Sequence, residues 1–280
     1  MRDSLRHSRF RTRLFMAIAL LSFLASANAQ SQPAAGEAPG PDENPPVPKK
    51  IAAGDFRTVS WKTLFPNLLD DQRRIWTFPA GLAKGKHWIP ALTITGVTAG
   101  LVALDPHDAP YFRRTDSFSG FNQILSGTAT GLGTGAAPAS FYLVGLARHD
   151  VYAQQTGLFG GEALADALIV DAVLKGITQR YRPSAILPNG NFSNTWFKTG
   201  WGSAFNGTAS FPSGHSIAAF AVATVIARRY GNHRWVPWVS YGLAGLVGFS
   251  RVTNQAHFPS DVFMGAALGY CISRFAVLRH

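Results

Sequence analysis

Stretches of mostly apolar residues alternate with short polar segments from about residue 88 to the end of the chain. Alanine and leucine dominate these stretches, and none shows the strict alternation of apolar and polar residues that marks a half-buried strand. The pattern predicts an all-α fold, a single helical bundle of about six main helices. The predicted helical stretches are 88–104, 131–147, 161–174, 216–227, 235–249 and 262–272. 

The segments before this region have a different composition. Residues 1–29 are typical of a secretory signal peptide: five arginines precede an apolar run, and Ala27-Asn28-Ala29 supplies small residues for cleavage. The same segment is also compatible with an uncleaved membrane anchor. Residues 30–55, rich in Pro, Ala, Gly and Glu, predict a disordered linker. We expect one helical domain over 56–280, in which 59–82 form one or two amphipathic helices.

The apolar stretches leave the relation to a membrane open. A membrane-spanning helix needs about 20 mostly apolar residues. Most stretches are shorter, and 161–174 contains three acidic residues, which favours core helices of a soluble protein. However, three arginines between 216–227 and 235–249 resemble a cytoplasmic loop. We therefore expect an exported periplasmic protein, soluble or membrane-associated. The alternative is an integral inner-membrane protein whose site faces the periplasm.

The first of three polar clusters is Lys175-x6-Arg182-Pro183. Arginine offers a planar fork that binds phosphate oxygens in pairs, and lysine adds a compact point charge. If the helix continues to Pro183, Arg182 lies two turns beyond Lys175 on the same face and ends the helix, free to reach into a cleft. The pair also fits a basic helix terminus that faces solvent.

The second cluster is Pro212-Ser213-Gly214-His215. Serine before an apolar helical stretch is an N-cap signal, and a helix N-terminus suits an anion. Gly214 allows close approach of backbone and ligand. His215 would stand on the first turn, within reach of that anion, as a candidate general acid. An ordinary cap followed by a histidine is the alternative.

The third cluster is Ser250-Arg251-x5-His257-x3-Asp261. Arg251 follows an apolar stretch and marks a helix end, and Pro259 suits the first turn of the next helix. The i, i+4 spacing brings Asp261 near His257. A carboxylate on one ring nitrogen fixes the tautomer and leaves the other nitrogen as a nucleophile. A buried His–Asp pair that only joins two helices is the alternative.

Taken together, the three clusters match a family pattern in order and spacing: K-x6-R-P, P-S-G-H and S-R-x5-H-x3-D. The chain resembles the type 2 phosphatidic acid phosphatase–haloperoxidase superfamily, including bacterial class A acid phosphatases, from about residue 88 to residue 277. The resemblance implies a six-helix bundle and a phosphatase that needs no metal or cofactor. It assigns phosphate binding to Lys175, Arg182, Ser213, Gly214 and Arg251.

The resemblance also implies the catalytic roles. His257 would attack phosphorus and form a phosphohistidine, Asp261 would orient and activate it, and His215 would protonate the leaving alkoxide. The substrate would be a phosphate monoester, either a lipid phosphate such as phosphatidic acid or isoprenyl pyrophosphate, or a soluble phosphomonoester. Two alternatives remain: a vanadium-dependent haloperoxidase, with vanadate on His257, and a non-catalytic phosphate-binding membrane protein.

Charge and composition limit the classes of partner that we expect. The formal net charge is +11, and residues 1–29 contribute +4 of it, which leaves +7 after cleavage. This excess would attract phosphorylated small molecules, phosphorylated lipids and anionic membrane surfaces. No recognisable nucleic-acid module is present, so we expect no nucleic-acid partner. The loop 188–210 carries several aromatic residues, which either form a lid over the site or fix the loop to the body.

Overall fold

The computed structural model describes residues 56–200 and 202–279, and within them the regular structure is helical, which confirms the all-α prediction. All six predicted stretches lie in helices. The signal peptide and linker predicted for 1–29 and 30–55 lie outside the described residues. The long helices are α2 (Leu64–Ala83), α3 (Trp88–Arg114), α5 (Gly127–Ala147), α6 (Val151–Thr178), α8 (Gly214–Arg229), α9 (Trp235–Thr253) and α10 (Pro259–Cys271).

Shorter elements complete this description. They are the helices α4 (Ser119–Ile124) and α7 (Ser203–Asn206), the 3₁₀ turn η1 (Pro183–Ala185) and the π-helical turn η2 (Ile272–Val277). The single helix α2 covers most of the segment predicted to be amphipathic.

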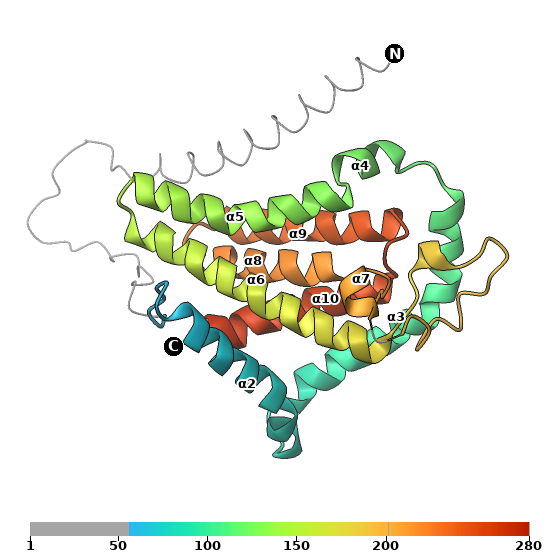
Figure 1. Ribbon diagram of the computed structural model, residues 1–280, viewed down its shortest axis with the longest axis horizontal. Coiled ribbons are helices and arrows are strands. Elements are labelled where there is room, and N and C mark those ends of the chain that lie inside the picture. The colour runs from blue at the N-terminus through green and yellow to red at the C-terminus, as the bar shows by residue number, and fades with distance from the viewer. Residues whose placement is uncertain (1–55, 201, 280) are drawn as a thin grey trace, which may run out of the picture. The chain divides into compact units, whose positions relative to one another are not determined.

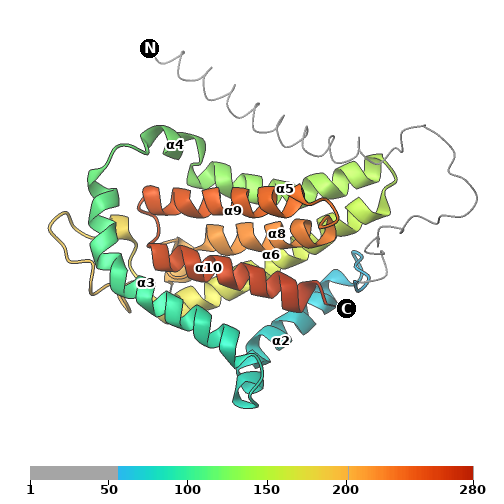
Figure 2. The same cartoon turned by 180° about the vertical axis from the view of Figure 1, so that it is seen from behind.

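Helix α8 forms the centre of the bundle. It packs against α6, α9 and α10, and these helices run side by side with α5 (Figures 1 and 2). Its buried face is made of small and β-branched residues such as Ile217, Ala221 and Val225. These side chains meet Phe159 and its apolar neighbours on α6, which forms the main hydrophobic core. Burial of this face stabilises the bundle at about 25 cal/mol per Å² of apolar surface.

Glycines let α10 approach α8 closely. A Cβ atom on Gly265 would lie 2.7 Å from the carbonyl oxygen of Ser213, and one on Gly269 would overlap the carbonyl oxygen of Ile217. The first of these contacts lies beside the second cluster, so the close packing also fixes the start of α8 against α10. A backbone hydrogen bond from Ser213 N–H to Asp261 O, 3.0 Å long, joins the same two helix starts.

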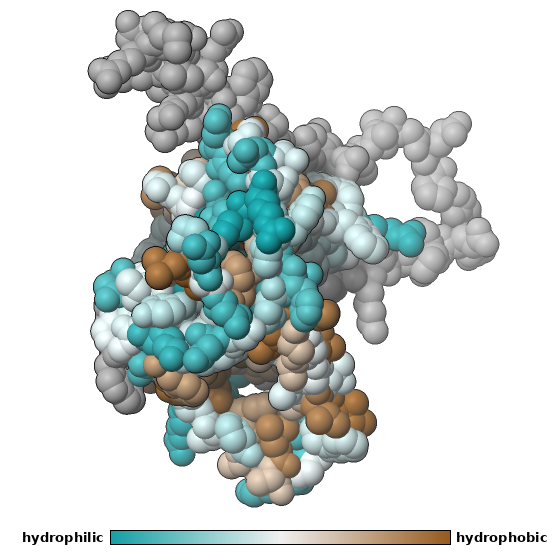
Figure 3. Space-filling model, turned by 90° about the vertical axis from the view of Figure 1, so that its right-hand side faces the viewer, coloured by the Kyte–Doolittle hydropathy of each residue, from teal (hydrophilic) through white to brown (hydrophobic). Residues whose placement is uncertain are grey.

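Helix α3 runs along the outside of the bundle, where it packs on α10 (Figure 2). It continues past the predicted end at residue 104 to Arg114, through Pro106 and Pro110. In the described part of the chain, α3 alone is long and apolar enough to cross a membrane, and only 11% of its most apolar window is buried. Figure 3 shows apolar side chains on the lower surface of the end that carries α3, with polar side chains above them.

Candidate active site

All three clusters lie at one end of the bundle. Helices α6 and α9 end there, and α8 and α10 begin there, because consecutive helices run in opposite directions (Figure 1). Two helix C-termini therefore supply Lys175 and Arg251, while two helix N-termini supply His215 and Asp261. The predicted starts of α8 after Ser213 and of α10 at Pro259 are confirmed, as is the end of α9 just after Arg251.

The path from Lys175 to Arg182 differs from the prediction. Helix α6 ends at Thr178, because Gln179 adopts a left-handed conformation (φ 46°) and its N–H caps the carbonyl of Lys175. Arg182 follows in extended backbone before Pro183. The prediction that the helix continues to Pro183 is wrong, so Arg182 reaches the site from an extended segment rather than from the face of α6.

Lys175 lies directly against the N-terminus of α8. Its Nζ contacts Asp171 Oδ2 at 2.7 Å, and both side chains are largely buried. A Cβ atom on Gly214 would lie 2.8 Å from Asp171 Oδ2 and 3.0 Å from Lys175 Nζ. Only glycine leaves room for this contact, which places the ammonium group beside the helix terminus that Ser213 caps. A cation and a helix N-terminus are both electrostatically favourable surroundings for an anion.

His215 and Arg251 meet at the start of α5. His215 Nε2 donates to the carbonyl oxygen of Gly127 at 3.0 Å, and Arg251 donates to the carbonyl oxygen of Leu125 and to Ser250 Oγ. Burial lowers the pKa of His215, and the hydrogen bond to Gly127 opposes this. The second and third clusters are thus joined through the connection between α4 and α5 and the first residue of α5, which lie outside both.

Arg182 brings a cation with an unused donor to the site. Its side chain is partly buried, and its Nε has no hydrogen-bond partner among the described residues. Burial lowers the pKa of Arg182, while the negative charges of Asp171 and Asp261 oppose that effect. A buried guanidinium N–H without a partner costs free energy, and a bound anion would remove that cost.

His257 is buried and 3.7 Å from Asp261, measured from Nδ1 to Oδ2. The nearest acceptor for Nδ1 is instead the carbonyl oxygen of Ser210, at 2.7 Å. Asp261 Oδ2 accepts from Phe258 N–H at 2.8 Å and from Ser210 Oγ. Burial lowers the pKa of His257 to about 4, against the effect of Asp261. The ring is therefore neutral at neutral pH, with Nδ1 donating and Nε2 available.

Sequence reasoning missed several residues behind the site. Arg180 pairs with both Asp105 and Asp261, Ser210 fixes the ring of His257, and Asp171 fixes Lys175. Asp171 stands four residues before Lys175, a spacing that signals a helical ion pair. Asp105 lies far away in the sequence and gave no signal. Among the described residues, no group of three or more His, Cys, Asp or Glu is placed to hold a metal ion.

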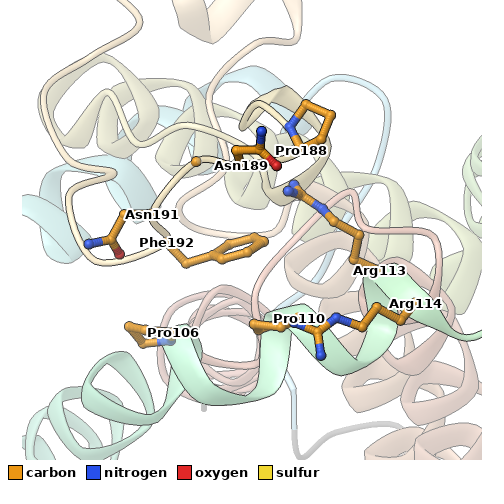
Figure 4. Close-up of a pocket in the computed structure, with 9 residues that line it drawn as sticks. Pro106, Pro110, Arg113, Arg114, Pro188, Asn189, Asn191 and Phe192 are labelled. Carbon is orange, nitrogen blue, oxygen red and sulfur yellow. The ribbon is translucent and has the colours of Figure 1, made fainter.

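The first part of the loop 188–210 is fixed to the body by its aromatic residues. Phe192 is buried against Phe258, and Trp196 packs on Phe211 with ring centroids 5.1 Å apart. Between this loop and α3 lies a pocket of about 280 Å³ (Figure 4). On its wall, Arg113 donates to the carbonyl oxygens of Pro183, Ile186 and Leu187, so its charge is occupied by backbone rather than free for a ligand.

Comparisons with known proteins agree with the motif spacing. Residues 157–280 match the PAP2 superfamily. The lipid A 1-phosphatase of Porphyromonas gingivalis is 44% identical over 72 residues, which are 24% of this chain and 16% of that protein. The bacitracin transport permease protein BcrC of Bacillus licheniformis is 33% identical over 113 residues, 40% of this chain and 50% of that protein. The matches thus span half or less of these curated relatives.

A solved structure is also similar. It is the crystal structure of a transmembrane PAP2 type phosphatidylglycerolphosphate phosphatase from Bacillus subtilis, with 21% sequence identity and a TM-score of 0.40, over 76% of this chain and 91% of that one. The family match itself covers α8, α9, α10 and most of α6, and with them all three clusters. The match to the PAP2 superfamily thus falls on the part of the chain, residues 157–280, in which the clusters predicted a family resemblance.

Proposed function

We propose that this protein is a phosphatase that hydrolyses phosphate monoesters through a phosphohistidine, without a metal. The observation that carries the proposal is the buried Nε of Arg182, which has no hydrogen-bond partner within the described part of the chain and lies in a site that also holds Lys175 and Arg251. Three cations and the N-terminus of α8 converge near two carboxylates, Asp171, which pairs with Lys175, and Asp261, which pairs with Arg180. A phosphate dianion fits that arrangement, because its oxygens accept from several fixed donors at once.

The chemistry follows from the placement of the two histidines. Nε2 of His257 attacks phosphorus as the bond to the leaving oxygen breaks, and protonated His215 gives that oxygen its proton. A bound dianion favours the proton on His215, which burial otherwise disfavours. Water then attacks the phosphorus of the phosphohistidine, His215 takes the proton that water loses, and the bond from phosphorus to Nε2 breaks, which releases phosphate and restores His257. Lys175, Arg182 and Arg251 stabilise the charge on the phosphoryl oxygens throughout.

The surface supports a phosphorylated lipid as substrate. α3 is long and apolar enough to lie in a bilayer, and exposed apolar side chains such as Trp88 and Leu92 run along it. The first relative is named for action on lipid A, a phosphorylated lipid. We infer a membrane-associated enzyme that acts on lipid phosphates at the bilayer surface. The expected export signal would place its site in the periplasm.

The test is phosphate release by the purified full chain in detergent, with EDTA present. The substrates are phosphatidic acid and p-nitrophenyl phosphate, and the variants are His257→Ala and, as a matched control, His107→Ala, which changes an exposed histidine on α3. We expect release by the wild type and the control and none by His257→Ala. Labelled substrate should leave an acid-labile, base-stable phosphoenzyme in the wild type.

Other outcomes would redirect the proposal. Activity of His257→Ala at the wild-type level would refute the phosphohistidine. Reversible loss of wild-type activity in EDTA would refute metal independence. If the wild type releases no phosphate from either substrate, bromide oxidation with added vanadate tests the haloperoxidase alternative. A preference for p-nitrophenyl phosphate over phosphatidic acid would refute the lipid assignment while leaving the mechanism intact.

A further inference from the structure

Arg180, in the first cluster, lies buried behind the nucleophile rather than at the phosphate site. Only 1% of the residue is exposed. Its Nη1 donates to Asp261 Oδ1 at 2.6 Å, and its Nη2 donates to Asp105 Oδ2, also at 2.6 Å. The guanidinium carbon lies 4.0 Å from the ring centroid of Phe258 and 4.5 Å from that of Trp196. The charge of Arg180 is thus fixed in position between two carboxylates.

Asp105 is the more distant of the two carboxylates. It lies on α3, is fully buried, and also accepts hydrogen bonds from the N–H and the hydroxyl of Ser260. Burial raises the pKa of Asp105, and the charge of Arg180 and the hydrogen bonds from Ser260 and Arg180 oppose that rise. With both carboxylates ionised, one guanidinium faces two negative charges, so the group carries a net negative charge. A buried group of this kind persists only where its hydrogen bonds are well satisfied, and here both ion pairs of the guanidinium are 2.6 Å long.

Asp261 acts on His257 mainly through its charge. The hydrogen bond that sets the tautomer of the ring runs from Nδ1 to the carbonyl oxygen of Ser210. The carboxylate, 3.7 Å from Nδ1, favours a proton on the ring by Coulomb attraction. That attraction weakens as Arg180 neutralises Asp261 more completely. Because Asp105 competes for the same guanidinium, it influences how far Asp261 is neutralised.

On the basis of the proposed function, we propose that Arg180 and Asp105 are positioning residues that set the protonation of the nucleophile. The guanidinium of Arg180 donates to both carboxylates and neutralises each only in part. Asp105 thereby affects how strongly the charge of Asp261 favours a proton on His257. Asp105 lies outside the region that matches the superfamily, so this control comes from the part of the chain that precedes that region.

The other charged groups around His257 fix the sign of the effect. Lys175 and Arg182 disfavour a proton on the ring, and Asp261 favours it. The other charged and titratable groups that the surrounding elements bring to this end of the bundle include Asp171 on α6, His215 on α8, Arg251 on α9, Arg180 after α6 and Asp105 on α3. Asp105→Asn removes a negative charge and leaves Arg180 to Asp261 alone, so His257 should bind its proton less readily.

The experiment measures kcat/KM against pH for the full chain, because the acidic limb reports protonation of the free nucleophile. Asp105→Asn keeps the shape of the side chain and should move the acidic limb to lower pH by about 0.5 to 1 unit, the effect of one charge at this range. Arg180→Met combined with Asp105→Asn leaves Asp261 without its cation. This double variant does not leave two unpaired carboxylates, and it should move the acidic limb to a higher pH than in the wild type.

A matched control and an independent readout keep the proposal testable. Asp166→Asn also replaces a fully buried acidic side chain, but one that contacts Gln72 and whose pKa burial raises to about 7, and it should leave the limb unchanged. The ring nitrogens of ¹⁵N-labelled His257 should show the same shifts in an NMR titration without substrate. If the wild type proves inactive, the proposed function fails while the titration still tests this inference. Limbs or titrations of Asp105→Asn and the double variant that coincide with the wild type would overturn it.

Discussion

Replacing Gly214 by alanine should reduce activity while leaving the fold stable. The new Cβ would lie 2.8 Å from Asp171 Oδ2 and 3.0 Å from Lys175 Nζ, whereas ordinary contacts begin at 3.4 Å. The carboxylate must therefore move by at least about 0.6 Å and the ammonium by about 0.4 Å. Both atoms are the free ends of flexible side chains, so the displacement itself costs little. The ammonium that should contact phosphate, however, is displaced.

The expected magnitude follows from this displacement. A shift of about 1 Å in a catalytic group can cost about 100-fold in rate, so a shift of about half that size should lower kcat/KM by about 10- to 100-fold. This is a loss of about 1.4 to 2.7 kcal/mol of transition-state stabilisation. The free energy of unfolding should change by no more than about 1 kcal/mol, because alanine favours a helix over glycine by about that much.

The assay pairs steady-state phosphate release with urea unfolding of the same preparations. Gly176→Ala is the matched control: it lies one residue beyond Lys175 on α6, and its Cβ would meet nothing within 4 Å. The control should retain full activity. If Gly214→Ala keeps kcat/KM within twofold of the wild type at unchanged stability, the placement of Lys175 at the helix terminus is not required for catalysis and the reasoning is refuted.

Further predictions test other features. Arg182→Lys should lower kcat/KM about 100-fold at an unchanged Tm, because a point charge cannot replace the fork and no partner within the described residues is lost; a large fall in Tm would contradict this. Gly269→Ala should cost about 1 to 3 kcal/mol in urea unfolding, since α10 must move away from α8, whereas Gly245→Ala, with nothing near its Cβ, should not. The pKa of His257 is about 4 in the fold against 6.5 when exposed. The contribution of the neutral ring to the free energy of unfolding is therefore complete above pH 6.5 and is lost as the pH falls to 4. His257→Gln should therefore flatten the unfolding free energy across that window by up to about 3 kcal/mol, and parallel curves would contradict the inferred burial.

Periodicity and capping residues predict much of the fold. Apolar stretches reveal a helix wherever one face is buried, and Ser213 and Pro259 mark helix starts through local chemistry. The end of α6 escaped prediction because Gln179 takes a left-handed conformation that most residues avoid. Its cause lies in the loop that pairs with it, through Lys198 N–H to Gln179 O, and a sequence window cannot show such a distant contact.

The candidate site, too, could be predicted from the sequence only in part. Residues that need a fixed spacing, such as Lys175 and His257, can be found from the motifs. The residues that adjust them come from elsewhere: Ser210 uses a backbone carbonyl, which any residue type offers, and Asp105 acts across 75 positions from Arg180. The nearest acceptor of His257 is therefore a feature that only the folded chain reveals.

The carbonyl of Gly127, which receives the hydrogen bond from His215, lies outside the region that matches the superfamily and so limits which fragments of this protein can work. The stretch that carries the recognised motifs depends on residues outside it, because the start of α5 accepts the hydrogen bond of His215 and α3 carries Asp105, which pairs with Arg180 behind His257. A fragment beginning at residue 157 would keep every motif yet lose both supports. Chimaeras that exchange the first helices between relatives should therefore change the chemistry of the site. The unit that evolves together would be the motif region with α3 and α5, not the motif region alone.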